Sequence, residues 1–282
     1  VSGESDLNSD GRSDWAFVAS SISSPDNSIG YVLFGVPPHI ASNSSLWPPR
    51  LDELSGGDGS KGFVFLSSST SPKATTPAGR IGPLASGCDF NADSIDDLII
   101  GGADGVFVFV LFGRAVGVGW PAIVELDSSV GVTFVSTSDV HFGMTVSCTD
   151  FNADGHDDIV TSNYGQWALV LWGSSNWNNW MGSPTTAVPY DLDSTLDPAH
   201  GMKITCYGAN DVSQFGFFTA GVGDLNSDTY EDIMVSNRGE QVTANANGRV
   251  FLLWGSPQWT TSTFSVDDLS SDHGIIIDGT YD

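Results

Sequence analysis

One nine-residue pattern occurs four times along the chain and divides it into repeats of similar length. The pattern is Asp-x-Asn-x-Asp-x-x-x-Asp with an apolar second residue, and its copies span residues 6–14, 89–97, 150–158 and 224–232. Recurrence of one motif at intervals of several tens of residues is typical of proteins built from repeated structural units. We therefore predict four modules, at approximately residues 1–78, 79–139, 140–212 and 213–282.

The pattern places oxygen-bearing side chains at alternate positions of a short loop. Positions one, three, five and nine offer carboxylate or amide oxygens, which are the ligands that a hard cation such as calcium requires. Position seven can contribute only its backbone carbonyl, and its side chain varies freely among Arg12, Ile95, His156 and Tyr230. We expect the ring of His156 to point to solvent. The sequence thus predicts about four calcium ions, one in each loop.

Two other interpretations of these loops are weaker. An EF-hand loop also alternates Asp and Asn, but it ends with a Glu at position twelve. The residues at that position here are Phe17, Ile100, Thr161 and Val235, none of which can ligate through its side chain. Asp- and Asn-rich turns without a metal are the remaining alternative. The repetition of the same oxygen-bearing positions in every copy favours the metal site over such turns.

Short runs rich in Val, Ile, Phe and Trp surround each loop, which indicates β-strands. One run follows each loop, at residues 15–18, 98–100, 159–160 and 233–235. A second run ends in an aromatic residue and Gly, at 31–35, 109–113, 168–173 and 250–255. A third run lies at 62–66, 131–135, 201–205 and 274–277. With one strand before the loop, each module is predicted to hold four strands, and no helical periodicity is evident. The expected fold class is all-β, with β-propeller blades of four antiparallel strands.

Each loop is expected to lie in the hairpin between the first and second strands of its module. Its second residue, which is Leu7, Phe90, Phe151 or Leu225, would then point inward as an apolar anchor. The metal would neutralise three carboxylates that otherwise repel one another over a few ångströms. Its predicted role is therefore structural.

The order of these motifs resembles a known repeat family. Phe142-Gly143 or Phe215-Gly216 precedes a loop, and the run after the second loop ends at Gly101-Gly102. This arrangement resembles the FG-GAP repeat, the calcium-binding blade repeat of integrin alpha-subunit propellers, over essentially the whole chain. The resemblance implies a β-propeller with an ion in the hairpin loop of each blade. The metal ligands that it implies, with the seventh residue of each loop acting through its carbonyl, are Asp6, Asn8, Asp10, Arg12 and Asp14; Asp89, Asn91, Asp93, Ile95 and Asp97; Asp150, Asn152, Asp154, His156 and Asp158; and Asp224, Asn226, Asp228, Tyr230 and Asp232.

The chain also departs from the family pattern. Ile81 replaces the opening Phe of the second module, and Ser94 and Thr229 replace Gly at the sixth loop position. Because such turns tend to need a positive φ there, we expect these two loops to bind calcium less tightly than the loops with Gly11 and Gly155. Integrin-type propellers have seven blades, so we expect the four modules to belong to a larger ring or array. We also expect the chain to be a processed form or a part of a longer protein.

The composition restricts the partners and the compartment. The chain carries 34 acidic and 9 basic residues, a formal net charge of -25, so nucleic acid is an unsuitable partner. No stretch is long and apolar enough to span a bilayer. The three cysteines allow at most one internal disulfide, and we expect three buried thiols instead. Repeated calcium loops of modest affinity suit an extracellular or cell-surface location, where Asn43 would be a glycosylation sequon.

Three functions remain open. The histidines lack the spacing of a metal site or a triad, so we do not expect an enzyme. A carbohydrate-binding, lectin-like propeller is suggested by Trp177 and Trp180 with Trp172 nearby, although these rings can equally cover outer strands. A non-catalytic accessory propeller of a larger secreted enzyme is another alternative. The leading prediction is an extracellular calcium-binding module for adhesion, protein–protein interaction or assembly, whose partners are other protein chains or glycans, with self-assembly as a further option.

Overall fold

The computed structural model describes most of the chain. The described residues are 2–20, 28–41, 50–67, 80–103, 107–136, 141–163, 165, 167–176, 190–192, 196–206, 214–238 and 246–280. Asn43, Trp177 and Trp180 lie outside these residues.

The described strands form four sheets, which confirms the all-β prediction. The first sheet contains β1 (Ser2–Ser5), β2 (Asp14–Ser20), β3 (Ser28–Leu33), β4 (Gly62–Leu66) and β8 (Ile123–Glu125). The second contains β5 (Ile81–Cys88), β6 (Asp97–Gly102), β7 (Phe107–Leu111), β9 (Gly131–Val135) and β13 (Tyr190–Asp191). The third contains β10 (Val146–Thr149), β11 (Asp158–Ser162), β12 (Trp167–Leu171), β14 (Gly201–Thr205) and β18 (Thr263–Ser265). The fourth contains β15 (Phe215–Gly223), β16 (Asp232–Asn237), β17 (Ala246–Leu253) and β19 (Gly274–Thr280).

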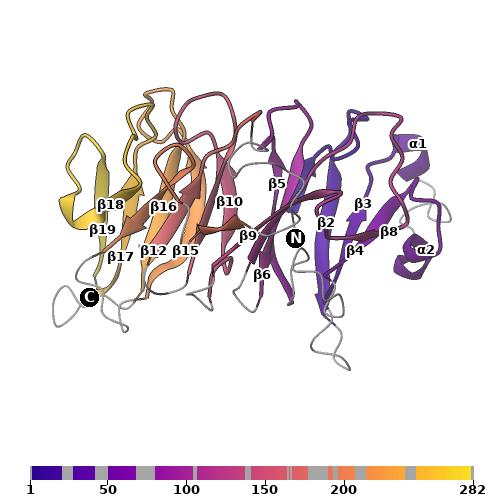
Figure 1. The fold of residues 1–282 in the computed structure, drawn as a ribbon, viewed down its shortest axis with the longest axis horizontal. Coiled ribbons are helices and arrows are strands. Elements are labelled where there is room, and N and C mark those ends of the chain that lie inside the picture. The colour runs from indigo at the N-terminus through magenta and orange to yellow at the C-terminus, as the bar shows by residue number, and fades with distance from the viewer. Residues whose placement is uncertain are drawn as a thin grey trace.

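The sheets stand side by side in chain order (Figure 1), from the indigo first sheet to the yellow fourth sheet. The first strands of consecutive sheets contact one another, β1 with β5, β5 with β10, and β10 with β15. The first and fourth sheets therefore lie at opposite ends of a row (Figure 1). Within the described residues, no helix is long and apolar enough to cross a membrane.

The hydrophobic cores lie between consecutive modules. One core joins Leu7 and Phe63 of the first module to Leu98 and Trp120 of the second. The next two cores join the second module to the third and the third to the fourth in the same way. Burial of apolar area between the modules is the main favourable term that holds the row together.

A fifth strand, which the sequence analysis did not predict, extends each of the first three sheets. β8, β13 and β18 leave their own modules and pair in parallel with β4, β9 and β14 of the preceding modules. The Val64 N–H donates to the carbonyl of Ala122 at 2.9 Å, and the Lys203 N–H donates to the carbonyl of Ser262 at 2.9 Å. The fourth sheet has four strands among the described residues and ends at β19.

The first module differs from the others at the segment that supplies this strand. Glu125-Leu126-Asp127, at the end of β8 in the second module, corresponds in the sequence to Leu51-Asp52-Glu53-Leu54 in the first module, where the helix α2 (Leu51–Ser55) forms. Two further short helices in the described part of the chain are α1 (Pro38–Ala41) and the 3₁₀ helix η2 (Val266–Asp268). The sequence shows no helical periodicity at these places, because helices of a single turn are too short to produce a 3.6-residue pattern.

The expectation of three buried thiols was also wrong. Cys88 at the end of β5 and Cys148 on β10 form a disulfide between the second and third modules, and Cys206 is a buried cysteine outside this disulfide. Cys88 and Cys148 each lie just before one of the acidic loops, and their strands β5 and β10 contact each other directly. The packing of the second module against the third brings these two cysteines together, although they are 60 residues apart in the sequence.

Removal of this disulfide tests how much the covalent link between modules stabilises the chain. We expect Cys88→Ser combined with Cys148→Ser to lower the free energy of unfolding by about 2–4 kcal/mol, because the bond closes a long loop in the unfolded chain. Denaturant unfolding of the double variant and the native chain measures the difference. Cys206→Ala is the matched control, and a control loss as large as that of the double variant would contradict the expectation.

Candidate metal centre

The four acidic loops occupy equivalent hairpins. Each loop connects the first and second strands of its module, β1 to β2, β5 to β6, β10 to β11, and β15 to β16. The ninth loop residue is in every case the first residue of the second strand. The hairpin location predicted for the loops therefore agrees with the structure.

The first, third and fifth residues of each loop turn their oxygens toward the loop's own backbone. In the third module, the two carboxylate oxygens of Asp150 accept the N–H groups of Asp154 and Gly155, each at 3.0 Å. Asn152 Oδ1 accepts the same Asp154 N–H at 2.9 Å, and Asp154 Oδ1 accepts the His156 N–H at 3.0 Å. The same four bonds recur in the other loops at 2.7–3.1 Å. Oxygens of the first and third residues thus meet at one nitrogen in all four loops.

The ninth residue of each loop is a buried aspartate that ties the hairpin to the rest of its module. Asp158 Oδ2 accepts the N–H of Phe151 at 3.0 Å, and its Oδ1 accepts the N–H of Gly173 at 2.8 Å. The equivalent pairs, at 2.8–3.1 Å, are Leu7 and Gly35 on Asp14, Phe90 and Gly113 on Asp97, and Leu225 and Gly255 on Asp232. All four aspartates are at most 1% exposed.

Burial disfavours the charged form of these carboxyls. Loss of hydration raises the pKa of Asp14 to about 7 and that of Asp97 to about 8. Burial also raises the pKa of Asp158 well above its usual value and raises that of Asp232. The nearby acidic residues of the same loop act in the same direction in each case. A cation beside the loop would oppose both causes, since it stabilises carboxylates against burial and mutual repulsion.

The backbone of the loops is left-handed at two positions. The sixth residue has positive φ in all four loops, at 79° for Gly11, 65° for Ser94, 86° for Gly155 and 79° for Thr229, as predicted. Thr229 is β-branched, so it holds this conformation with strain. The fourth residue is also left-handed in every loop, which the sequence analysis missed; these residues are Ser9, Ala92, Ala153 and Ser227. Their small side chains were the only available signal.

The seventh residues do not behave uniformly. The ring of His156 is half-buried and its Nδ1 is buried without a hydrogen-bond partner, so the expectation that this ring points to solvent was wrong. Arg12 forms an ion pair with Asp10 of its own loop at 3.0 Å. The backbone-carbonyl role assigned to these residues and to Ile95 and Tyr230 stays a prediction.

The apolar second residue is buried in three of the four loops. Leu7, Phe90 and Phe151 are 0% exposed, as expected for an inward anchor. Leu225 is 54% exposed, so the expectation was wrong for the fourth loop. The three buried residues pack in cores that include the following module, whereas the fourth sheet, of β15, β16, β17 and β19, is the last in the row. The burial of this residue therefore depends on a neighbouring module.

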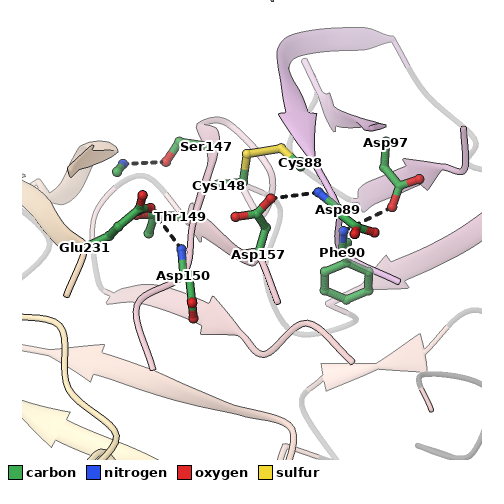
Figure 2. Close-up of a disulfide and its surroundings, with 11 residues drawn as sticks. Cys88, Asp89, Phe90, Asp97, Ser147, Cys148, Thr149, Asp150, Asp157 and Glu231 are labelled. Carbon is green, nitrogen blue, oxygen red and sulfur yellow. Dashed lines mark hydrogen bonds between the residues drawn. A yellow bond between two sulfur atoms is a disulfide. The ribbon is translucent and has the colours of Figure 1, made fainter. Parts of the chain in front are cut away.

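An acidic eighth residue links each later loop to the loop before it, which the sequence analysis did not recognise. Asp96 accepts the Asp6 N–H at 2.7 Å, and Asp157 accepts the Asp89 N–H at 2.7 Å. Glu231 accepts the Asp150 N–H at 3.1 Å and the Thr149 hydroxyl at 2.6 Å. Figure 2 shows the link between Asp157 and Asp89 alongside the Cys88–Cys148 bond, and the link from Glu231 to Thr149 and Asp150 next to it. The signal in the sequence was an acidic residue at the eighth position of the last three loops. The first loop has Ser13 at this position.

The donor set fits a hard cation, although its carboxylates are not gathered around a single point. Among the residues that the structure describes, no group of three or more His, Cys, Asp or Glu side chains lies close enough together to hold a metal ion. The three carboxylates of a loop instead accept different N–H groups, which keeps like charges apart. Each loop nevertheless supplies only oxygen donors from positions one, three and five on one turn, which is the chemistry that calcium prefers.

The aromatic cluster considered for sugar binding is only partly described. Trp172 is 5% exposed, and its Nε1 donates to the carbonyl of Pro198 at 3.0 Å. Its ring stacks near Phe151 at 6.4 Å between centroids. Trp172 is thus a core residue and does not offer a sugar-binding face.

Comparisons with known proteins assign no family. The search against protein-family models finds no match, and the search of curated proteins finds none either. The functional interpretation therefore depends on the geometry of the repeated loops.

The ninth-position aspartate should be more important for stability than the fifth. We expect Asp158→Ala in calcium-free buffer to lower the free energy of unfolding by about 3 kcal/mol, because two buried N–H groups lose their acceptor. The exposed Asp154→Ala is the matched control and should cost about 1 kcal/mol or less. Denaturant titration measures both, and equal losses would contradict the clamp role of Asp158.

Proposed function

We propose that this chain is a calcium-binding repeat protein of the FG-GAP type that mediates adhesion, protein–protein interaction or assembly outside the cell. The observation that carries the proposal is the recurrence of one oxygen-rich loop geometry at four equivalent hairpins. A single Asp- and Asn-rich turn would have an ordinary structural explanation. Four such turns with the same hydrogen bonds support a shared ligand.

Each loop would hold its ion with the oxygens of positions one, three, five and nine and the carbonyl of position seven. In the third module these are Asp150, Asn152, Asp154, Asp158 and His156. A bound calcium supplies positive charge and up to eight oxygen coordination positions. The loop residues would fix the hairpin and its orientation toward the next module. The ion would therefore stabilise the fold rather than take part in a reaction.

We further propose that the four sheets are blades of a β-propeller. Support comes from the inner contacts of β1, β5, β10 and β15 and from the cores between consecutive sheets. Blades that pack face to face around a central axis bury their apolar surface in this way. The row in Figure 1 would then be an arc of such an arrangement.

An extracellular location is supported by two properties. The Cys88–Cys148 disulfide persists in oxidising compartments such as the cell surface. The net charge of -25 keeps the chain soluble and would be partly neutralised by calcium at the concentrations found outside cells. Partners of such a surface would be other protein chains or glycans.

Calcium should raise the thermal stability of the chain. A site at a hundredfold excess of ion over its dissociation constant adds about 2.7 kcal/mol to the free energy of unfolding. We therefore expect a chelator to lower the melting temperature by ten degrees or more, on the order expected for several such sites. Scanning calorimetry with calcium, magnesium or chelator measures the change.

A variant that removes one carboxylate from a loop shows whether calcium stabilises the chain by binding there or only by reducing its overall negative charge. Asp228→Asn keeps an acceptor for the Tyr230 N–H, which lies 2.9 Å from Asp228 Oδ1, but it removes one ligand charge. We expect this variant to gain less stability from calcium than the native chain. Asp272→Asn changes an exposed acid outside the loops and is the matched control. An unchanged melting temperature in chelator would overturn the structural-metal proposal.

The sixth loop residue should determine the order of calcium affinity among the four loops. Gly11 and Gly155 adopt positive φ without strain, whereas Ser94 and Thr229 do not. The loops at 6–14 and 150–158 should therefore bind calcium more tightly than those at 89–97 and 224–232. Thr229→Gly should stabilise the chain by about 1 kcal/mol and tighten its own site, since the left-handed strain disappears. Gly155→Thr is the reciprocal variant, and isothermal titration calorimetry showing the opposite order would contradict the ranking.

A further inference from the structure

We propose that the acidic eighth residue of each later loop is a positioning residue for the calcium site of the loop before it. These residues are Asp96, Asp157 and Glu231. The inference rests on the calcium-binding function proposed above, and it adds that the affinity of a loop depends on a residue of the next module. The hydrogen bonds that join consecutive loops support it.

The eighth residue holds the backbone of the first ligand of the preceding loop. Asp157 accepts the N–H of Asp89 at 2.7 Å, although the two residues are 68 positions apart in the sequence (Figure 2). The carboxylate oxygens of Asp89 accept the N–H groups of Asp93 and Ser94 at 2.9 Å and 2.8 Å. Hydrogen bonds to charged groups are stronger than those between neutral groups. Asp157 therefore fixes the backbone of Asp89, while the second loop fixes its carboxylate.

The same bond recurs at the other two junctions. Asp96 accepts the N–H of Asp6 at 2.7 Å, and Glu231 accepts that of Asp150 at 3.1 Å. Glu231 also accepts the hydroxyl of Thr149 at 2.6 Å, which holds its longer side chain in place. A role limited to holding modules together would not require the contact to fall on the same loop position each time. The first ligand is the target in all three cases, which favours the positioning of that ligand.

The eighth residue also lies between two proposed ligands of its own loop. Among the described residues, the Asp157 carboxylate bonds to the second loop and to no group of the third. Its neighbours in the sequence are His156 and Asp158, the proposed seventh and ninth ligands of the third loop. Ordering of these two ligands on binding would therefore also order Asp157 and, through it, Asp89. This arrangement couples the two sites, and a coupling between binding sites is reciprocal.

A second chain of hydrogen bonds joins the ninth ligands of consecutive loops. The N–H of Phe90 donates to Asp97 at 3.1 Å, and the carbonyl of Phe90 accepts the Ser174 N–H at 2.9 Å. The residue before Ser174 is Gly173, whose N–H donates to Asp158 at 2.8 Å. The same chain joins Asp14 to Asp97 through Leu7, Arg114 and Gly113, and Asp158 to Asp232 through Phe151, Ser256 and Gly255. No eighth residue belongs to this second chain, so a change at the eighth position tests the first link separately.

Removal of the carboxylate of Asp157 tests the positioning role. In the full chain, Asp157→Ala should raise the calcium concentration at half-saturation of the loop at 89–97 about fivefold or more, a typical size for coupling between sites. The shift should be clearly smaller for the loop at 150–158, to which Asp157 itself belongs. Hydrogen exchange followed by mass spectrometry, repeated over a calcium titration, measures the two midpoints separately.

Two further variants separate positioning from charge. Asp157→Asn removes the charge but keeps an oxygen that can accept the Asp89 N–H, so the midpoint at 89–97 should return to within about twofold of the native value. Glu125→Ala removes an exposed acid outside the loops and should leave both midpoints within about twofold of native. A midpoint in Asp157→Asn as high as that in Asp157→Ala would assign the effect to charge and overturn the proposal.

Glu231 repeats the test one module further along the chain. Glu231→Ala should raise the midpoint of the loop at 150–158, and Glu231→Gln should restore it. Equal shifts in every loop would indicate a general loss of stability and overturn the proposal. An unchanged midpoint at 89–97 in Asp157→Ala, with native loops that calcium protects, would overturn this proposal alone. Native loops that calcium does not protect would overturn the proposed function as well.

Discussion

A buried aspartate holds three separate parts of every module in one place. Asp97, for example, begins the second strand, accepts the N–H of the second loop residue and accepts the N–H of Gly113 after the third strand. Both oxygens are used, so an asparagine with its single acceptor oxygen could not replace this residue without leaving one N–H unsatisfied. A side chain at Gly113 would collide with the carbonyl of Asp96, which explains the glycine of the aromatic-Gly motif. The ninth aspartate of the loop motif and the glycine of the aromatic-Gly motif are thus the two partners of one hydrogen bond.

The modules complete one another through contacts that run in one direction. Each module covers the face of the module before it with a short strand, an aromatic-rich core and an acidic eighth residue. Trp259 of the fourth module, for instance, lies 5.6 Å from Phe151 of the third, with the two rings stacked. Nearest-neighbour coupling of this kind makes the stability of a repeat protein a sum of intrinsic and interface contributions. The three cores between consecutive modules are the interfaces that the described residues show.

The sequence alone was sufficient to predict the features that recur in every module. The loops, their hairpins and the four antiparallel strands recur with the same residue types, so propensity and repetition identify them. The additional strands are too short for a pattern, because β13 has two residues and β8 has three. Pairing of Cys88 with Cys148 requires the packing of β5 on β10, which no spacing rule contains. The eighth loop residue was overlooked because its carboxylate serves the neighbouring loop rather than its own.

The contrast between Phe151 and Leu225 shows why burial cannot be read from a module alone. Both residues occupy the second position of the same motif and follow an aspartate that accepts the same two loop N–H groups. One is 0% exposed and the other 54%, because the third module has a successor in the row and the fourth ends it. The apolar second residue is therefore half of an interface that each module presents to the next. Asp96, Asp157 and Glu231 supply the matching contact in the opposite direction, because each carboxylate accepts an N–H from the loop of the module before it.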